Sequence, residues 1–187
     1  HVGGTCLADP GDFEKWMMLI NAAKAKGSLV SLDPNIRPSL ITDMVEFSRR
    51  MARACEAADL IKASDEDCEI LFGTSALDEL TAGPFAGAQL VVMTRGSKGA
   101  LGKMVNGTIT DVPCAPLASL VDTVGAGDCF QAGLLAHLWH GGYLLSSEAL
   151  ASLPSNILHE AIAFGHAVAA INCGRHGCNP PWMRELK

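Results

Sequence analysis

Apolar residues recur every three or four positions in several stretches of the chain, with polar residues between them. In the stretch 11–26, Phe13, Met17, Ile20 and Ala23 fall on one face, and Gly27 ends the pattern. This spacing is typical of a helix that packs one side on a core. By the same criterion we predict helices over 11–26, 40–58, 66–72, 126–139 and 157–172.

Short apolar runs lie between the predicted helices. We predict buried strands at 29–32, 60–61 and 90–94, and a hairpin of 100–104 and 108–112 around Asn106-Gly107. Strands that alternate with long helices indicate βαβ units, so the fold class is α/β, with a mostly parallel sheet, helices on both faces and an antiparallel edge. No repeat or linker divides residues 1–187, and we therefore predict one domain.

The composition narrows the class of protein. Of the 187 residues, 49% are hydrophobic and 18% are charged, which excludes a disordered chain, and the longest apolar runs are too short to span a bilayer. The net charge of −6 argues against a nucleic-acid or membrane partner, yet it allows a local phosphate site built from backbone N–H groups. The seven cysteines are odd in number and form no CxxC pair, which favours reduced thiols in a cytoplasmic protein over disulfides or zinc.

Polar clusters follow the predicted strands at 33–37, 64–67 and 94–99, and another occupies 122–128. Ligands of parallel sheets gather beyond the carboxyl ends of the strands, so we expect these clusters to face one crevice. The last cluster ends in Gly125-Ala126-Gly127-Asp128, directly before a predicted helix. Small residues at a helix N-terminus leave N–H groups open to an anion, and an adjacent carboxylate can take a proton from an attacking hydroxyl. The alternative for Asp128 is an acid that merely favours the first turn of a helix.

The whole string Asp122-Thr123-Val124-Gly125-Ala126-Gly127-Asp128 resembles the signature of the PfkB, or ribokinase-like, carbohydrate kinase family. Four further motifs follow the family's order. Residues 33–40 (DPNIRPSL) resemble the DPNxRPxLW segment of the fructokinase and 2-keto-3-deoxygluconate kinase branch, and residues 62–67 (KASDED) stand where the family has KxNxxE. Residues 94–100 (TRGSKGA) match a TxGxxG turn. Residues 173–182 (CGRHGCNPPW) are similar to the CxRxGAxPPW ending of bacterial fructokinases. The resemblance implies a ribokinase-like, Rossmann-like fold. It also implies first strands and a small β lid that this chain lacks, so an incomplete C-terminal portion of a kinase is expected.

The resemblance assigns roles to individual residues. Asp128 would be the catalytic base, and the N–H groups of Gly125, Ala126, Gly127 and Asp128 would hold the transferring phosphoryl group. The nucleotide site would comprise Ser64, Thr94, Gly96, Gly99 and His166, and Asn35 and Arg37 would make contacts near the phosphoryl group. Asp67 would have a role in binding Mg²⁺. A monovalent cation, with K⁺ as the candidate, would be held by Asp122 and by the carbonyls of Val124, Asn172, Arg175 and Gly177.

Several positions keep a second interpretation. Ser64 replaces the motif's Asn and Asp67 its Glu, and together they also fit a helix capping box. Arg37 alone could be a surface residue, and His166 on an apolar helix could be a packed core histidine. His137 and His140 lack further metal ligands, so a partly exposed pair is expected. Cys178 stands where the family has Ala.

The expected function is therefore phosphorylation of a sugar by ATP with Mg²⁺, with fructose as the first candidate sugar. A 2-keto-3-deoxygluconate kinase or another sugar kinase of the family is the runner-up, and a non-catalytic binding or regulatory protein derived from a kinase stays open. A dinucleotide-binding oxidoreductase fits poorly because no GxGxxG directly follows a strand. The sugar is the expected partner, and a homodimer is an arrangement left open.

Overall fold

The computed structural model describes residues 1–117 and 119–186, and these residues contain one six-stranded sheet with the spatial order β1-β2-β3-β4-β5-β6. Strands β1 to β4 are parallel, and β5 and β6 continue the sheet as an antiparallel hairpin. The strands are β1 Val2–Gly3, β2 Ser31–Asp33, β3 Leu60–Ser64, β4 Leu90–Thr94, β5 Ala100–Met104 and β6 Ile109–Val112. The predicted α/β class, with its parallel sheet and antiparallel edge, is confirmed.

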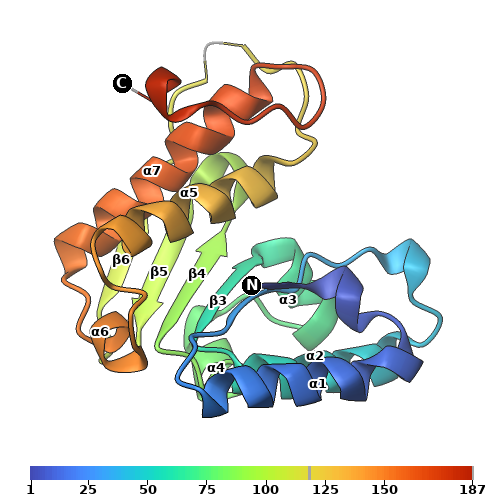
Figure 1. The fold of residues 1–187 in the computed structure, drawn as a ribbon. Helices are drawn as coiled ribbons and strands as arrows, with labels where there is room; N and C mark the ends of the chain where they lie inside the picture. The colour runs from blue at the N-terminus through green and yellow to red at the C-terminus, as the bar shows by residue number, and fades with distance from the viewer. Residues whose placement is uncertain (118, 187) are drawn as a thin grey trace.

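Helices lie on both faces of this sheet (Figure 1). One face carries α1 Pro10–Ala25, α2 Met44–Ala57, α3 Asp65–Phe72 and α4 Leu77–Ala82; the other carries α5 Ala126–His140, α6 Ser147–Ala151 and α7 Ser155–Cys173. Short 3-10 turns occur at Gly4–Leu7, Pro38–Leu40, Gly96–Lys98 and Met183–Glu185. In the residues that the structure describes, no helix is both long and apolar enough to cross a membrane.

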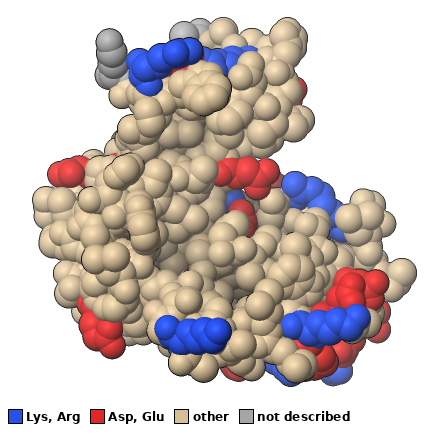
Figure 2. All heavy atoms as spheres, in the orientation of Figure 1, with Lys and Arg blue, Asp and Glu red and all other residues tan. Residues whose placement is uncertain are grey.

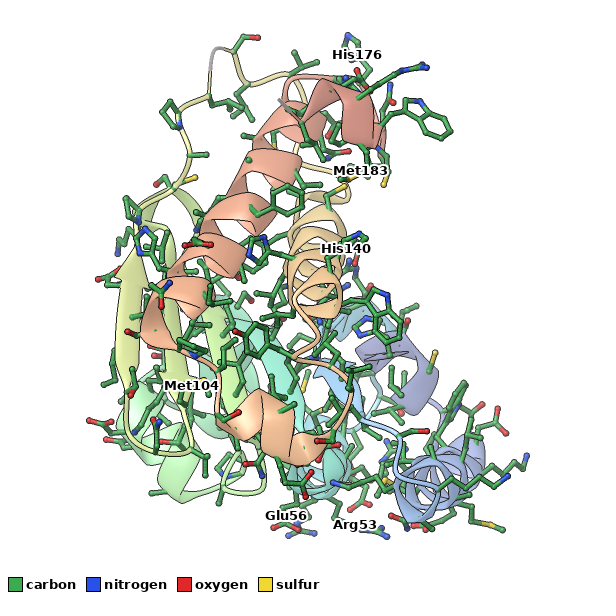
Figure 3. The ribbon with its side chains drawn as sticks, turned by 60° about the vertical axis from the view of Figure 1, so that its left-hand side comes forward. Arg53, Glu56, Met104, His140, His176 and Met183 are labelled. Atoms are coloured by element: carbon green, nitrogen blue, oxygen red, sulfur yellow. The ribbon has the colours of Figure 1, made fainter. Side chains whose placement is uncertain are left out.

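The two central strands send alternate side chains to opposite faces. Ile61 and Val91 pack in the cluster with α1 to α4, whereas Leu60, Leu90 and Val92 pack in the cluster with α5 to α7. This is the two-residue period of a strand that is buried on both sides. Met104, labelled in Figure 3, belongs to the second cluster.

Helices α5 and α7 cross at glycines, which brings their backbones close together. A Cβ on Gly133 would lie 3.0 Å from the Cα of Gly165, and a Cβ on Gly165 would lie 2.9 Å from the carbonyl oxygen of Phe130. Such contacts leave no room for a side chain at either position. The close packing fixes α5, and with it the helix start that follows the 122–125 segment.

Several elements differ from the prediction. The helix predicted over 40–58 begins only at Met44, because Asp43 caps it through the N–H of Glu46 and the preceding residues form a 3-10 turn that begins at Pro38. The strand predicted at 60–61 continues to Ser64, since the lysine at position 62 is buried inside it. The strand predicted at 29–32 runs over Ser31–Asp33 instead, and the two short helices α4 and α6 were not predicted.

Candidate active site

The polar clusters that follow β2 and β3 meet the start of α5 at one edge of the sheet. The Nδ2 of Asn35 donates to Oδ1 of Asp128 at 3.1 Å, and the N–H of Ile36 donates to Oδ1 of Asp67 at 3.3 Å. Thr94 reaches the same edge through its register with Ser64 in the β3–β4 pair. Because parallel strands present their carboxyl ends together, residues that lie far apart in the sequence meet at this edge of the sheet.

The start of α5 has the geometry of an anion-binding turn. Gly125 is the N-cap, with φ 75° and ψ 5° in the left-handed region where glycine is favoured. Asp128 follows in the first turn, and its side chain is exposed. Among the described residues the N–H groups of Gly125, Gly127 and Asp128 have no protein acceptor, so they are open to an anion.

One of the predicted donors is already used. The N–H of Ala126 donates to the carbonyl oxygen of Thr123 at 3.1 Å, which closes the turn before α5. The set of four donors expected from the sequence is therefore corrected to three. Ala126 contributes its small side chain and the conformation of the turn rather than an open donor.

Asn35 links Asp128 to Arg37. The Nη1 of Arg37 donates to Oδ1 of Asn35 at 2.7 Å, and the other end of the Asn35 amide holds Asp128. Asn35 has φ 36°, a left-handed conformation that asparagine adopts more readily than most residues. Arg37 is thus part of a polar chain that ends on Asp128, and it is not an isolated surface residue.

A buried ion pair lies beneath these groups, and no sequence motif predicted a role for it. Nζ of Lys62 lies 2.9 Å from Oδ2 of Asp33, and the two side chains are 5% and 2% exposed. Burial raises the pKa of Asp33; Lys62 opposes this effect, while the charges of Asp67 and Asp128 add to it. The signal in the sequence was a lysine in the middle of an otherwise apolar strand.

Ser64 and Asp67 complete only half of the predicted capping box. Oγ of Ser64 accepts the N–H of Asp67 at 3.0 Å, which confirms Ser64 as the N-cap of α3. The Asp67 carboxylate does not return to the cap and instead accepts the N–H of Ile36, so the second half of the box is wrong. That orientation turns Asp67 towards the candidate site and leaves Oδ2 without a protein donor among the described residues.

The predicted nucleotide turn follows β4. Gly96 has φ 55°, and a Cβ there would meet nothing within 4 Å. At Gly99, with φ 88°, a Cβ would lie 2.1 Å from the carbonyl oxygen of Val112, so the close approach of β6 requires glycine at this position. Oγ1 of Thr94 donates to the carbonyl oxygen of Ala63 at 3.4 Å. The nucleotide roles of Thr94, Gly96 and Gly99 stay predictions.

His166 lies in the core between α5 and α7. It is 6% exposed, its ring packs on Phe130 with centroids 4.9 Å apart, and burial lowers its pKa. This placement favours the packed-histidine interpretation, and a contact with adenine stays a prediction. His137 and His140, at the end of α5 (Figure 3 labels His140), are partly exposed and exposed, respectively. No three His, Cys, Asp or Glu side chains of the described chain form a metal-binding group.

The residues predicted to hold a monovalent cation come together next to the start of α5. Asp122 accepts the N–H groups of Val124 at 3.0 Å and Gly177 at 2.9 Å, and these bonds hold the pKa of Asp122 below its ordinary value. Nδ2 of Asn172 donates to the carbonyl oxygen of Val124 at 2.9 Å, and the N–H of Arg175 donates to the carbonyl of Asn172 at 3.0 Å. The C-terminal loop is therefore fastened to the 122–124 segment.

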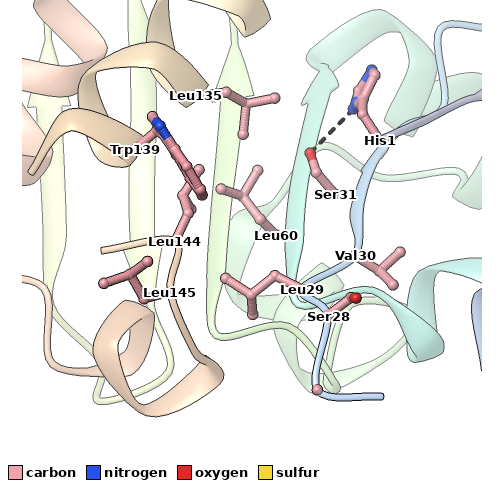
Figure 4. A pocket seen from close by; sticks show the side chains of 11 residues that line it. His1, Ser28, Leu29, Val30, Ser31, Leu60, Leu135, Trp139, Leu144 and Leu145 are labelled. Atoms are coloured by element: carbon pink, nitrogen blue, oxygen red, sulfur yellow. Dashed lines mark hydrogen bonds between the residues drawn. The ribbon is translucent and has the colours of Figure 1, made fainter. Parts of the chain in front are cut away.

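The surface around the site is hollowed and locally charged. In Figure 2, charged side chains gather beside the hollow between the α5–α7 side and the α1–α3 side of the molecule. A separate apolar groove of about 440 Å³ lies between β2, β3 and α5, and Figure 4 shows Leu60, Leu135 and Trp139 on its walls. None of the candidate catalytic residues lines this groove, so its size does not make it the site of chemistry.

Comparisons with known proteins agree with this fold. The sequence profile described as pfkB family carbohydrate kinase matches residues 1–185. The chain is 38% identical over 160 residues to a fructokinase of Rhizobium leguminosarum bv. trifolii, an alignment that covers 84% of this chain and 48% of the relative. The chain thus spans about half the length of that curated relative.

Two solved structures are similar over almost the whole chain. One is a fructokinase double mutant from Vibrio cholerae O395 in its fructose-, ADP- and potassium-bound form, with a TM-score of 0.78 and 28% identity, covering 95% of this chain and 55% of that one. The other is an aminoimidazole riboside kinase from Salmonella enterica with a TM-score of 0.81 and 26% identity, covering 99% and 60%. These likenesses confirm the predicted fold class.

Proposed function

The chain belongs to the pfkB family of carbohydrate kinases, and we propose that it carries the catalytic part of an enzyme that transfers a phosphoryl group from ATP to a hydroxyl group of fructose. One observation carries the proposal: the carboxylate of Asp128 lies in the first turn of α5 beside the open N–H groups of Gly125 and Gly127, and Asn35 orients it. A general base and an anion hole thus occupy the same helix start.

Asp128 acts on the attacking hydroxyl in this proposal. Its Oδ1 accepts the Asn35 amide, which fixes the direction of the carboxylate, and Oδ2 is left to accept the hydroxyl proton. Because the side chain is exposed at the crevice, a sugar can reach it. The open N–H groups of Gly125, Gly127 and Asp128, together with the positive end of the helix dipole, stabilise the negative charge of the phosphoryl group during in-line transfer.

The acidic residues of the site fit a magnesium ion that arrives with the nucleotide. Asp67 has one carboxylate oxygen without a protein donor among the described residues, and the charges of Asp67 and Asp128 both act on Asp33. Mg²⁺ usually binds through one or two carboxylates and the substrate phosphates, so the lack of a cage of three protein ligands is compatible with it. Bound there, Mg²⁺ would neutralise phosphate charge, and Asp67 would hold it directly or through water.

We also propose the monovalent site at the carbonyls of Val124, Asn172, Arg175 and Gly177. The hydrogen bonds of Asp122 and Asn172 support this proposal, because they tie the segment 122–124 to the C-terminal loop beside the anion-binding turn. A cation held there would support the positive potential of the turn. K⁺ is the candidate because a similar fructokinase has been solved with potassium bound.

Fructose is favoured over 2-keto-3-deoxygluconate by the fructokinases among the similar proteins and by the C-terminal loop motif. A non-catalytic binding protein would keep the fold and lose the base, and this chain retains Asp128 together with its partner Asn35. The intact arrangement favours the enzyme.

The test is Asp128→Asn, made in the protein expressed from its whole reading frame. We expect the kcat for fructose phosphorylation to fall about 10²- to 10⁴-fold, because the base is lost, while ATP·Mg²⁺ binds with unchanged affinity in isothermal titration. Asp65→Asn is the matched control, since Asp65 also lies in the first turn of a helix but not at the start of α5. An Asp128→Asn enzyme with nearly full activity would refute the base, and a wild-type protein that binds no nucleotide would favour the non-catalytic alternative.

A further inference from the structure

The buried side chain of Lys62 lies directly beneath the anion-binding turn. Its ammonium group is 3.1 Å from the position that a Cβ on Gly127 would occupy, so it contacts the backbone of the first turn of α5. Lys62 extends from β3, and its only partner among the described residues is Asp33, on β2. Two strands of the sheet thus deliver a fixed positive charge to the start of a helix.

Stability alone does not explain a cation at this place. The N-terminus of a helix carries partial positive charge, so a neighbouring cation is repelled there and favoured at the opposite end. Burying an ion pair brings little net stability, because the cost of removing both charges from water is about as large as their attraction. A residue that is kept at an electrostatically unfavourable position, in spite of the energetic cost of burying its charge, is typical of a functional site.

The hydrogen bonding of the ion pair is also incomplete on the Asp33 side. Only Oδ2 of Asp33 meets the ammonium group; Oδ1 is buried and has no hydrogen-bond partner among the described residues. Burial raises the pKa of Asp33 in spite of Lys62, so the attraction does not fully offset the loss of water. Around the pair stand two further carboxylates, Asp67 and Asp128, and the exposed cation Arg37. The ammonium group is therefore the buried positive charge of a largely acidic site.

We propose that Lys62 is a positioning residue for phosphoryl transfer, whose buried charge, held by Asp33, acts through the first turn of α5 and strengthens the anion hole. The proposal rests on the proposed function, because it concerns the same helix start. In this proposal Lys62 acts through the turn and not on the substrate, because its ammonium group lies against the backbone of Gly127. In surroundings with little water its field is weakly screened and adds to the partial charges of the open N–H groups of Gly125 and Gly127.

Two variants separate charge from structure. Lys62→Met with Asp33→Asn replaces the ion pair by neutral groups of similar volume, a change that buried pairs often tolerate. Asp33→Asn alone also removes the ion pair but keeps the ammonium group, which can still donate to the asparagine oxygen. A purely structural role predicts the larger defect in Asp33→Asn, because that variant leaves the buried ammonium group without its counter-charge. A role of the positive charge predicts a defect in the double variant alone.

The first readout needs no turnover. Inorganic phosphate is titrated into the protein from the whole reading frame, and the backbone N–H signals of Gly125 and Gly127 are followed by NMR. We expect phosphate to bind these groups about ten- to a hundredfold more weakly in the double variant, and within threefold of wild type in Asp33→Asn. A loss in Asp33→Asn as large as or larger than that in the double variant, unchanged binding in both, or a wild-type protein whose Gly125 and Gly127 signals do not respond would each overturn the proposal.

The second readout is kinetic and separates this proposal from the proposed function. In the double variant kcat should fall by a similar factor at a nearly unchanged KM for ATP, because the ammonium group acts on the transferring group and not on the rest of the nucleotide. A wild-type protein that binds phosphate as expected but phosphorylates no sugar would refute the kinase and leave only the effect of Lys62 on anion binding. If the double variant fails to unfold cooperatively, Lys62→Gln, whose amide can still donate to Asp33, replaces it under the same criteria.

Discussion

Gly125 offers a direct test of how the anion-binding turn is built. Its φ of 75° and ψ of 5° cost an alanine about 1–2 kcal/mol, because the left-handed conformation brings Cβ too close to the backbone. The added Cβ would also lie 2.4 Å from Sγ and 3.0 Å from Cβ of Cys178. Relieving such an overlap costs about 1–3 kcal/mol, so Gly125→Ala should lower the free energy of unfolding by about 2–5 kcal/mol in all.

Gly73 is the matched control for the backbone contribution. It has φ 72° and ψ 14° at the end of α3, and a Cβ there would meet nothing within 4 Å. Gly73→Ala should therefore cost only about 1–2 kcal/mol. Removing the side chain of Cys178 should relieve the overlap, so in a Cys178→Gly background Gly125→Ala should cost no more than Gly73→Ala does.

The assay is urea unfolding of the four variants, followed by circular dichroism, with free energies extrapolated to water. The same proteins are assayed for kcat/KM, which we expect to fall for Gly125→Ala because its Cβ pushes the turn away from the C-terminal loop. If Gly125→Ala proved no more destabilising than Gly73→Ala, the contact between the turn and Cys178 would be refuted. If Cys178→Gly failed to relieve the cost, the overlap would lie elsewhere.

Two further predictions concern stability. Asp122→Asn should remove a pH-dependent contribution to the free energy of unfolding. The N–H groups of Val124 and Gly177 hold the pKa of Asp122 in the folded protein below its ordinary value of 3.8. The contribution is therefore complete well above pH 3.8, and it is lost as the pH falls through the folded-state pKa. Urea midpoints should therefore differ between variant and wild type at pH 6, and the difference should shrink as the pH falls below 3.8; a constant difference would contradict this. Leu134→Ala, which empties a fully buried position on α5, should cost about 2–5 kcal/mol in the same assay, whereas Leu145→Ala, 70% exposed, should stay within about 0.5 kcal/mol, and equal effects would contradict the packing of α5.

The sequence by itself determined the α/β class, the long helices and the edge at which the polar clusters gather. These features follow from local patterns: apolar spacing in 11–26 defines a helix, Asn106-Gly107 defines a hairpin, and residues that follow parallel strands share one edge. The short helices α4 and α6 were missed because five or six residues hold too little periodicity to recognise. The late start of α2 was missed because a cap at Asp43 outweighed the apolar pattern before it.

Only the tertiary structure decided which partner each site residue chooses. Ser64 and Asp67 fit a capping box as sequence neighbours, yet the Asp67 carboxylate accepts the N–H of Ile36, which a different strand brings to it. Gly99 matches a nucleotide turn, yet the nearby backbone of β6 already requires glycine there.

The ion pair of Lys62 and Asp33 is the clearest case. Each residue stood within a recognised motif, but the two are 29 positions apart in the sequence, and they meet only because β2 and β3 pair side by side. The physical reason is general: local patterns select helices and strands through interactions of near neighbours, whereas the charge and hydrogen bonding of a site depend on groups that meet only after the sheet has formed.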